Sequence, residues 1–215
     1  MTCRQVNITR DGCGVSKLCT ETPNDCDPAG NSSCLFASLD AGTTMAPNGT
    51  LLSVELRGDS TGYIALGLTQ NVSEGTTALF ICAQNNGSFF FRTMSKNNTD
   101  ETLTPTETIT QEIRGMVNGD VIKCEFEIPN VNATMTRTTE STTFVILLGN
   151  GTTDGTALGP FMTLLNSGSL NVANPASNTG TTAAPGNGTT MSGADHPHAV
   201  PLLLSVLAAF LVFRA

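Results

Sequence analysis

The hydrophobic pattern in the middle of the chain is typical of short β-strands. Apolar and polar side chains alternate in residues 51–57 and again in residues 120–128, which predicts strands with one buried face and one face toward solvent. Other runs are more continuously apolar, and this favours central strands covered on both faces. These runs are residues 77–83, 88–93 and 143–148.

Residues 62–82, with the sequence GYIALGLTQNVSEGTTALFIC, hold two apolar strands joined by a polar loop. The first strand carries large apolar side chains on one face and only Ala65 and Gly67 on the other. A face of small residues allows close approach, by a second sheet in the common case or by a flat cofactor in the rare one. The loop at residues 69–76 contains no His, Cys or Met.

These strands are separated by turn residues, and no segment has the pattern of an amphipathic helix of ordinary length. Short strands that recur about every 8–12 residues with Gly, Asn, Asp and Pro between them predict an all-β fold. We therefore expect one immunoglobulin-like antiparallel β-sandwich over residues 35–165, which is long enough for a single core.

The first 34 residues are rich in cysteine and in turn residues, and we expect disulfides to hold them together. The chain has seven cysteines, without a C-x-x-C pair and without a nearby histidine, so a disulfide framework is favoured over a zinc site. With Cys3 treated as unpaired, fifteen pairings are open. A bridge between Cys82 and Cys124 would join two predicted strands. The six candidates are Cys13, Cys19, Cys26, Cys34, Cys82 and Cys124.

The end of the chain has two distinct compositions. Residues 166–193 consist mainly of Asn, Ser, Thr, Gly, Ala and Pro, which favours a disordered stalk. After the small residue Ser192, residues 194–215 contain a polar spacer and then an apolar tail at residues 202–213. This is the pattern of a signal for a glycolipid (GPI) anchor. Ser192 is the expected attachment residue and Asn187 the alternative. The tail is shorter than the ~20 residues of a membrane-spanning helix, although a short span stays the competing interpretation.

The overall composition indicates a protein of the secretory pathway. A net charge of -8 with few charged residues argues against nucleic acid as a partner. N-x-[ST] glycosylation sites are spread along the chain, and in a sequence rich in Asn and Thr some of them arise by chance. No apolar run resembling a signal peptide begins this sequence, so we expect the leader to lie outside it. The sites are Asn7, Asn31, Asn48, Asn71, Asn86, Asn97, Asn132, Asn150 and Asn187.

No motif for a known catalytic chemistry is present. The sequence lacks G-x-S-x-G, H-E-x-x-H and a P-loop. Its only histidines are His196 and His198, within the predicted anchor signal, so the predicted sandwich has no histidine for acid–base catalysis.

Several short runs resemble the DOMON domain of the ferric-chelate reductase 1 family. The resemblance extends over about residues 11–165 and includes the order and spacing of the six cysteines. It implies an extracellular β-sandwich related to b-type cytochrome domains, which in full-length relatives accompanies a reeler domain and a cytochrome membrane domain. The runs are CG at 13–14, Cys19, NDCDP at 24–28, SCLF at 33–36, GYIAL at 62–66, Cys82, GDVIKC at 119–124 and DG at 154–155.

The chain departs from this family at the two positions that the resemblance marks as ligands of haem b. A methionine is expected in the loop after the GYIALGL strand, where this chain reads NVSEG at 71–75. A histidine is expected late in the domain, where residues 156–162 read TALGPFM. Met94 and Met162 are weak substitute ligands, because isolated methionines more often fill gaps in a core.

Two functions therefore stay open. The first is a lipid-anchored, glycosylated cell-surface DOMON module that has lost its haem and acts by binding a protein or small-molecule partner. The second, implied by the resemblance, is a haem b electron-transfer domain related to ferric-chelate reductase. A pocket for a sugar or another small ligand in place of haem is a weaker third possibility.

Overall fold

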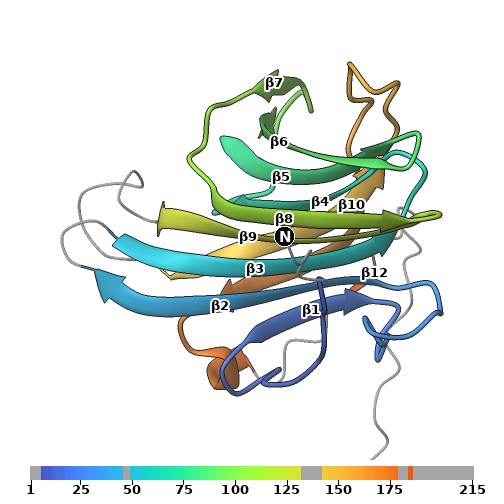
Figure 1. Ribbon diagram of the computed structural model, residues 1–215. Helices are drawn as coiled ribbons and strands as arrows, with labels where there is room; N and C mark the ends of the chain where they lie inside the picture. The colour runs from blue at the N-terminus through green and yellow to red at the C-terminus, as the bar shows by residue number, and fades with distance from the viewer. Residues whose placement is uncertain (1–5, 46–48, 132–141, 179–183, 186–215) are drawn as a thin grey trace, which may run out of the picture.

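The computed structural model describes residues 6–45, 49–131, 142–178 and 184–185. Its strands form two sheets in which all neighbours are antiparallel (Figure 1). The five-stranded sheet has the order β1 (Leu18–Thr22), β2 (Leu35–Met45), β3 (Gly49–Asp59), β9 (Val121–Val131) and β8 (Gln111–Asn118). The seven-stranded sheet has the order β12 (Ala184–Pro185), β11 (Met162–Asn171), β10 (Thr143–Gly151), β4 (Tyr63–Thr69), β5 (Thr76–Asn85), β6 (Ser88–Asn97) and β7 (Leu103–Pro105).

The predicted all-β antiparallel sandwich is confirmed. The only helix in the described part of the chain is one short 3-10 turn, Pro175–Asn178. Every strand predicted from the hydrophobic pattern overlaps β3, β4, β5, β6, β9 or β10, and the prediction for residues 120–128 begins one residue before β9. Among the residues described, no helix has the length and apolar character needed to cross a membrane.

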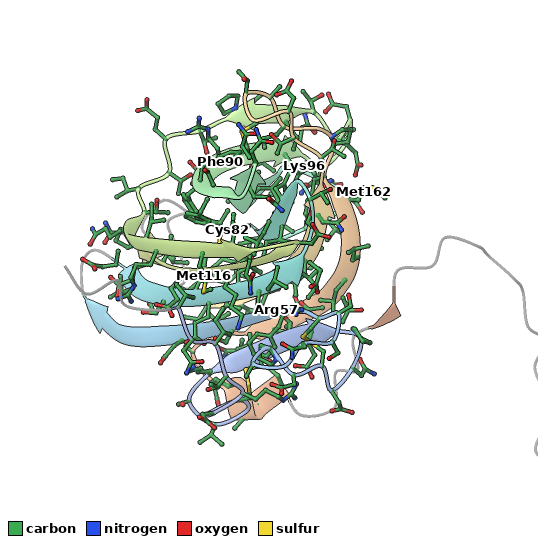
Figure 2. All side chains as sticks on the ribbon, turned by 45° about the vertical axis from the view of Figure 1, so that its right-hand side comes forward. Arg57, Cys82, Phe90, Lys96, Met116 and Met162 are labelled. Carbon is green, nitrogen blue, oxygen red and sulfur yellow. A yellow bond between two sulfur atoms is a disulfide. The ribbon has the colours of Figure 1, made fainter. Side chains whose placement is uncertain are left out.

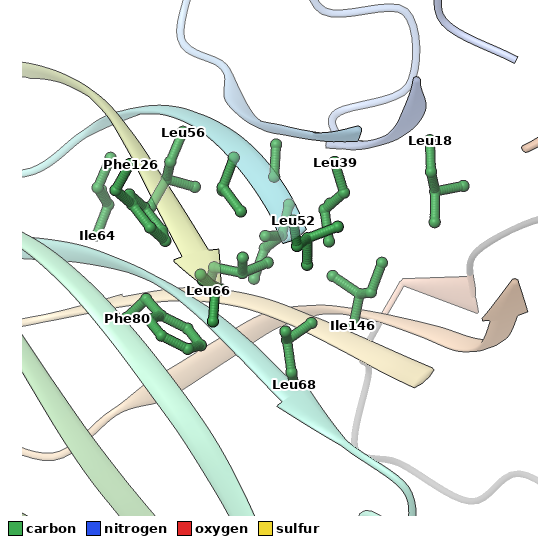
Figure 3. Close-up of a cluster of buried hydrophobic side chains, with 14 of the residues drawn as sticks. Leu18, Leu39, Leu52, Leu56, Ile64, Leu66, Leu68, Phe80, Phe126 and Ile146 are labelled. Carbon is green, nitrogen blue, oxygen red and sulfur yellow. The ribbon is translucent and has the colours of Figure 1, made fainter. Parts of the chain in front are cut away.

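The main core lies between the two sheets (Figure 3). Alternation in β3 directs Leu52, Val54 and Leu56 inward, and large residues of β4, such as Leu66, meet them from the other sheet. The Cys82–Cys124 disulfide, with a sequence separation of 42, joins β5 to β9 through this core. The predicted inter-sheet bridge is therefore present, and the remaining pairs are Cys13–Cys19 and Cys26–Cys34.

Strands β4, β5 and β10 are buried on both faces. A second cluster covers the outer face of the seven-stranded sheet, where Leu158 and Phe161, from the connection between β10 and β11, pack on residues such as Ile81. Full burial of β5 and β10 agrees with their continuous apolar runs. The same expectation for β6 is wrong, because only the short β7 lies beyond it and most of its side chains are partly exposed.

The cysteine-rich segment covers one end of the outer face of the five-stranded sheet. Ile8 and the Cys26–Cys34 bridge pack against Phe36 of β2. Beside them, the side chain of Arg57 on β3 is fully buried. Its Nη1 donates to the Cys34 carbonyl and, at 2.7 Å, to Asp59 Oδ2; its Nη2 donates to the Ser32 carbonyl at 3.0 Å. The segment therefore extends the sandwich, with β1 as an edge strand, and is held by a buried cation.

The folded part continues beyond residue 165, where we placed the start of the stalk. Strand β11 runs to Asn171, and Leu170 and Val172 belong to the main core. The 3-10 turn follows, with Asn178 Oδ1 accepting from Asn171 N at 2.9 Å. A composition rich in Ser and Asn concealed the strand, because its apolar residues are few and a register shift interrupts their alternation.

Replacing Arg57 by Ala should lower the free energy of unfolding by about 3 kcal/mol, because Asp59 and two carbonyl groups would lose a buried, charged donor. Arg114→Ala is the matched control: its ion pair with Glu125 is 42% exposed on the arginine side and should contribute less than about 1 kcal/mol. Guanidinium unfolding curves of the two variants measure both losses. Equal losses would mean that Arg57 contributes no more than a surface ion pair.

Candidate functional site

Both faces of β4, the first strand of the stretch 62–82, are covered by the protein itself. A Cβ atom at Gly67 would lie 2.9 Å from Thr77 Cγ2, 3.1 Å from Leu79 Cδ2 and 3.2 Å from Leu147 Cβ. Ala65 is fully buried in the outer cluster. The small residues therefore accommodate side chains of neighbouring strands, and no flat cofactor could lie against them without displacing these side chains.

The loop at residues 70–75 is fastened to the end of the sheet by Asn98. The Asn98 Nδ2 group donates to the carbonyl oxygens of Asn71 at 2.6 Å and Glu74 at 3.0 Å, and its Oδ1 accepts from Thr77 Oγ1 at 2.6 Å. Asn98 is buried, so these bonds are shielded from water. The side chain of Asn71 is exposed at this loop, where the family resemblance would place a methionine.

The two methionines considered as haem ligands are far apart. Met94 on β6 pairs with Leu79 and belongs to the outer cluster, whereas Met162 on β11 pairs with Asn150, which shares the inner side of β10 with Leu148. They therefore lie on opposite faces of the sheet (Met162 is labelled in Figure 2), and β10, β4 and β5 separate their strands, a distance of roughly 19 Å. Met94 and Met162 therefore cannot serve as the two axial ligands of one haem iron.

The connection between β10 and β11 folds back over the start of β4. Gly159 N donates to the Thr152 carbonyl at 2.8 Å, and the hydroxyl of Tyr63 donates to the Gly159 carbonyl at 3.0 Å. Asp154 Oδ1 accepts from the backbone N–H groups of Thr156 and Ala157, which lowers the pKa of this carboxyl. This loop holds no histidine, and its ordered turn places residues 156–158 beside β6.

The best candidate for a ligand site is a pocket of about 500 Å³ between this loop, the outer side of β6 and the chain after β7. We call it the β6 pocket. Its apolar lining is continuous with the outer cluster, in which Met94 and Leu158 take part. Its size lies in the range of small-molecule sites. The lining residues are Phe91, Arg92, Thr93, Met94, Pro105, Thr106, Thr110, Thr156, Ala157 and Leu158.

Arg92 is the only charged residue that lines the β6 pocket. Its guanidinium carbon lies 5.7 Å from the centre of the Phe90 ring, a cation–π contact that leaves the N–H groups available. Phe90 is labelled in Figure 2. Our strand prediction for residues 88–93 missed this site, although one arginine directly after three phenylalanines was a visible signal.

A second hollow, of about 450 Å³, lies on the uncovered outer face of the five-stranded sheet. It is acidic, and its two cations are already paired: Lys17 Nζ lies 2.9 Å from Glu55, and Arg114 Nη2 lies 2.9 Å from Glu125. In the part of the chain that the structure covers, no group of three or more His, Cys, Asp or Glu side chains could hold a metal ion.

The predicted modification sites divide by exposure. Asn150 is half-buried in β10, whereas the side chains of the other described sites are exposed: Asn7, Asn31, Asn71, Asn86 and Asn97. Several further predicted residues fall outside the described ranges, namely Cys3, Asn48, Asn132, Asn187, Ser192, His196 and His198.

Comparison with known proteins finds relatives named for ferric-chelate reductase 1, and no family model matches the chain. The chain is 25% identical over 142 residues to "Putative ferric-chelate reductase 1" of Danio rerio, and 22% identical over 143 residues to ferric-chelate reductase 1 of Homo sapiens. Each match covers 65% of this chain, but only 24% and 23% of the relatives. A Xenopus laevis relative is 33% identical over 73 residues, 34% of this chain and 11% of its own. The chain is therefore related to this family at low identity.

The single tyrosine offers a direct probe of this loop. Burial raises the pKa of Tyr63 from 10.0 to about 12. Because the unfolded chain loses its phenolic proton first, the free energy of unfolding should fall as the pH rises from about 10 to about 12. Phenolate absorbance of the folded chain should therefore titrate near pH 12, and Tyr63→Phe should abolish this part of the pH dependence. Titration near pH 10 in the folded chain would contradict the buried Tyr63–Gly159 contact.

Proposed function

We propose that this chain is a DOMON-type binding module of the cell surface, N-glycosylated and held by a GPI anchor, that works without haem. The relation to ferric-chelate reductase 1 proteins supports the module type. Exposed N-x-[ST] sites and three disulfides support a secretory-pathway protein. In this proposal the module has no reductase activity of its own and acts through a ligand or protein partner.

The observation that carries the haem-free part is the separation of Met94 from Met162 on opposite sides of the sheet. The other residue types that ligate haem iron are engaged or lie elsewhere. The six cysteines of the described region form disulfides, and the Tyr63 hydroxyl is bonded to Gly159. Both histidines, His196 and His198, lie within the predicted anchor signal.

The alternative, a haem b electron-transfer domain, can be tested by absorption spectroscopy. We expect the full chain, incubated with haemin and then with dithionite, to give the spectrum of free haem, because in the described structure Met94 and Met162 do not converge on one site. A reducible Soret band of b type would overturn the haem-free proposal. Repeating the absorption measurement with M94L and M162L would then identify which methionine, if either, ligates the haem iron.

The anchor is tested independently. Phosphatidylinositol-specific phospholipase C should release the protein from expressing cells, because a glycolipid would be its only link to the membrane. Replacing residues 202–213 by a polar sequence should prevent surface attachment, since the signal needs its apolar tail. Retention on cells that release a control GPI-anchored protein would favour the short membrane span.

A further inference from the structure

We infer that the β6 pocket binds a small organic anion, with an apolar body seated on Met94 and Leu158 and a carboxylate paired with Arg92. This inference rests on the proposed binding function and gives it a ligand class. It concerns a site on the outer side of β6, and none of the residues lining it lies in the stretch 62–82.

The charge distribution supports an anionic ligand. Among the lysine and arginine side chains that the structure describes, five are ion-paired within the protein, and only Arg92 and Lys123 are not. Arg92 is also the one charged residue of the pocket, in a chain whose net charge is -8. An unpaired cation in an otherwise neutral hollow attracts anions there, while the rest of the acidic surface repels them.

The position of the guanidinium suits a carboxylate. The guanidinium carbon of Arg92 lies over the Phe90 ring, and a cation–π contact does not use the N–H donors of a guanidinium. No hydrogen bond from this side chain to a described residue competes for those donors. A carboxylate can therefore accept two parallel hydrogen bonds, the strongest arrangement available to arginine.

The remaining lining defines the body of the ligand. Met94, Leu158 and Pro105 offer apolar contact, and the flexible thioether of Met94 adapts to irregular shapes. The hydroxyl groups of Thr110 and Thr156 make no hydrogen bond to described residues and can serve polar atoms at the rim. None of the lining residues is the asparagine of an N-x-[ST] site, so a glycan would be attached outside the pocket.

A matched pair of fluorinated probes tests this inference. 4-(Trifluoromethyl)phenylacetate and its neutral amide have nearly the same shape, and their binding to the full chain in lipid nanodiscs can be followed by fluorine NMR, with empty nanodiscs as the blank. We expect the carboxylate to bind about tenfold more tightly than the amide, the factor that one charge-assisted hydrogen bond supplies. Arg92→Gln should abolish this preference.

Two variants separate the pocket from general effects of charge and folding. Lys123→Gln removes the other unpaired cation, on the five-stranded sheet, and should leave the preference unchanged. Ala157→Phe should weaken the binding of both probes, because the larger side chain fills the pocket. The variant should still fold, because Ala157 is exposed and only its backbone is used in the turn. Equal affinity for the two probes, no binding of either, or an equal loss in Lys123→Gln would overturn the inference. A reducible b-type Soret band in the haem experiment would refute the haem-free function, and the outcome of the probe experiment would still be judged by itself.

Discussion

Strands β4, β5 and β10 are apolar on both sides, so both faces of the seven-stranded sheet must be shielded from water. The five-stranded sheet covers the inner face and contributes the main core. Among the described residues no third sheet covers the outer face, and the connection between β10 and β11 covers part of it with Leu158 and Phe161. Because this loop is short, it covers the outer face only as far as β6. The β6 pocket lies at the edge of the surface that the loop covers.

Part of the outer face of the five-stranded sheet is also apolar and must be covered, and the chain covers it in a different way. There the cover is the cysteine-rich segment, which has too few apolar residues to stay in place by burial alone. Two short disulfide loops stiffen it, and the fully buried Arg57 binds its carbonyl groups. Desolvating a guanidinium costs free energy, and the Arg57 Nε group has no partner in the described structure. Asp59 offsets this penalty by pairing with Nη1 and by accepting from Cys34 N at 3.0 Å.

Sequence reasoning could predict the strands whose side chains alternate or are continuously apolar, because burial on one or two faces leaves that periodicity. It missed β2, β8 and β11, in which register shifts interrupt the alternation and Thr, Ser, Gly and Asn replace apolar residues. The β6 pocket was beyond its reach for another reason. Its walls come from residues 91–94, 105–110 and 156–158, and only the strand order brings these segments together.

Several of the residues that carry the resemblance to ferric-chelate reductase 1 have a structural role in this chain. A side chain at Gly62 would collide with the Gly151 carbonyl oxygen, 2.3 Å from its Cβ position. Cys82 and Cys124 form the bridge between the sheets, and Asp154 caps the turn that holds residues 156–158. None of these roles requires a cofactor. A chain can therefore keep every one of these residues, and with them the sandwich, while the loops that would supply ligands to iron acquire other side chains. For that reason the resemblance is stronger evidence for the fold than for the chemistry, and the activity depends on sites such as the one at Arg92.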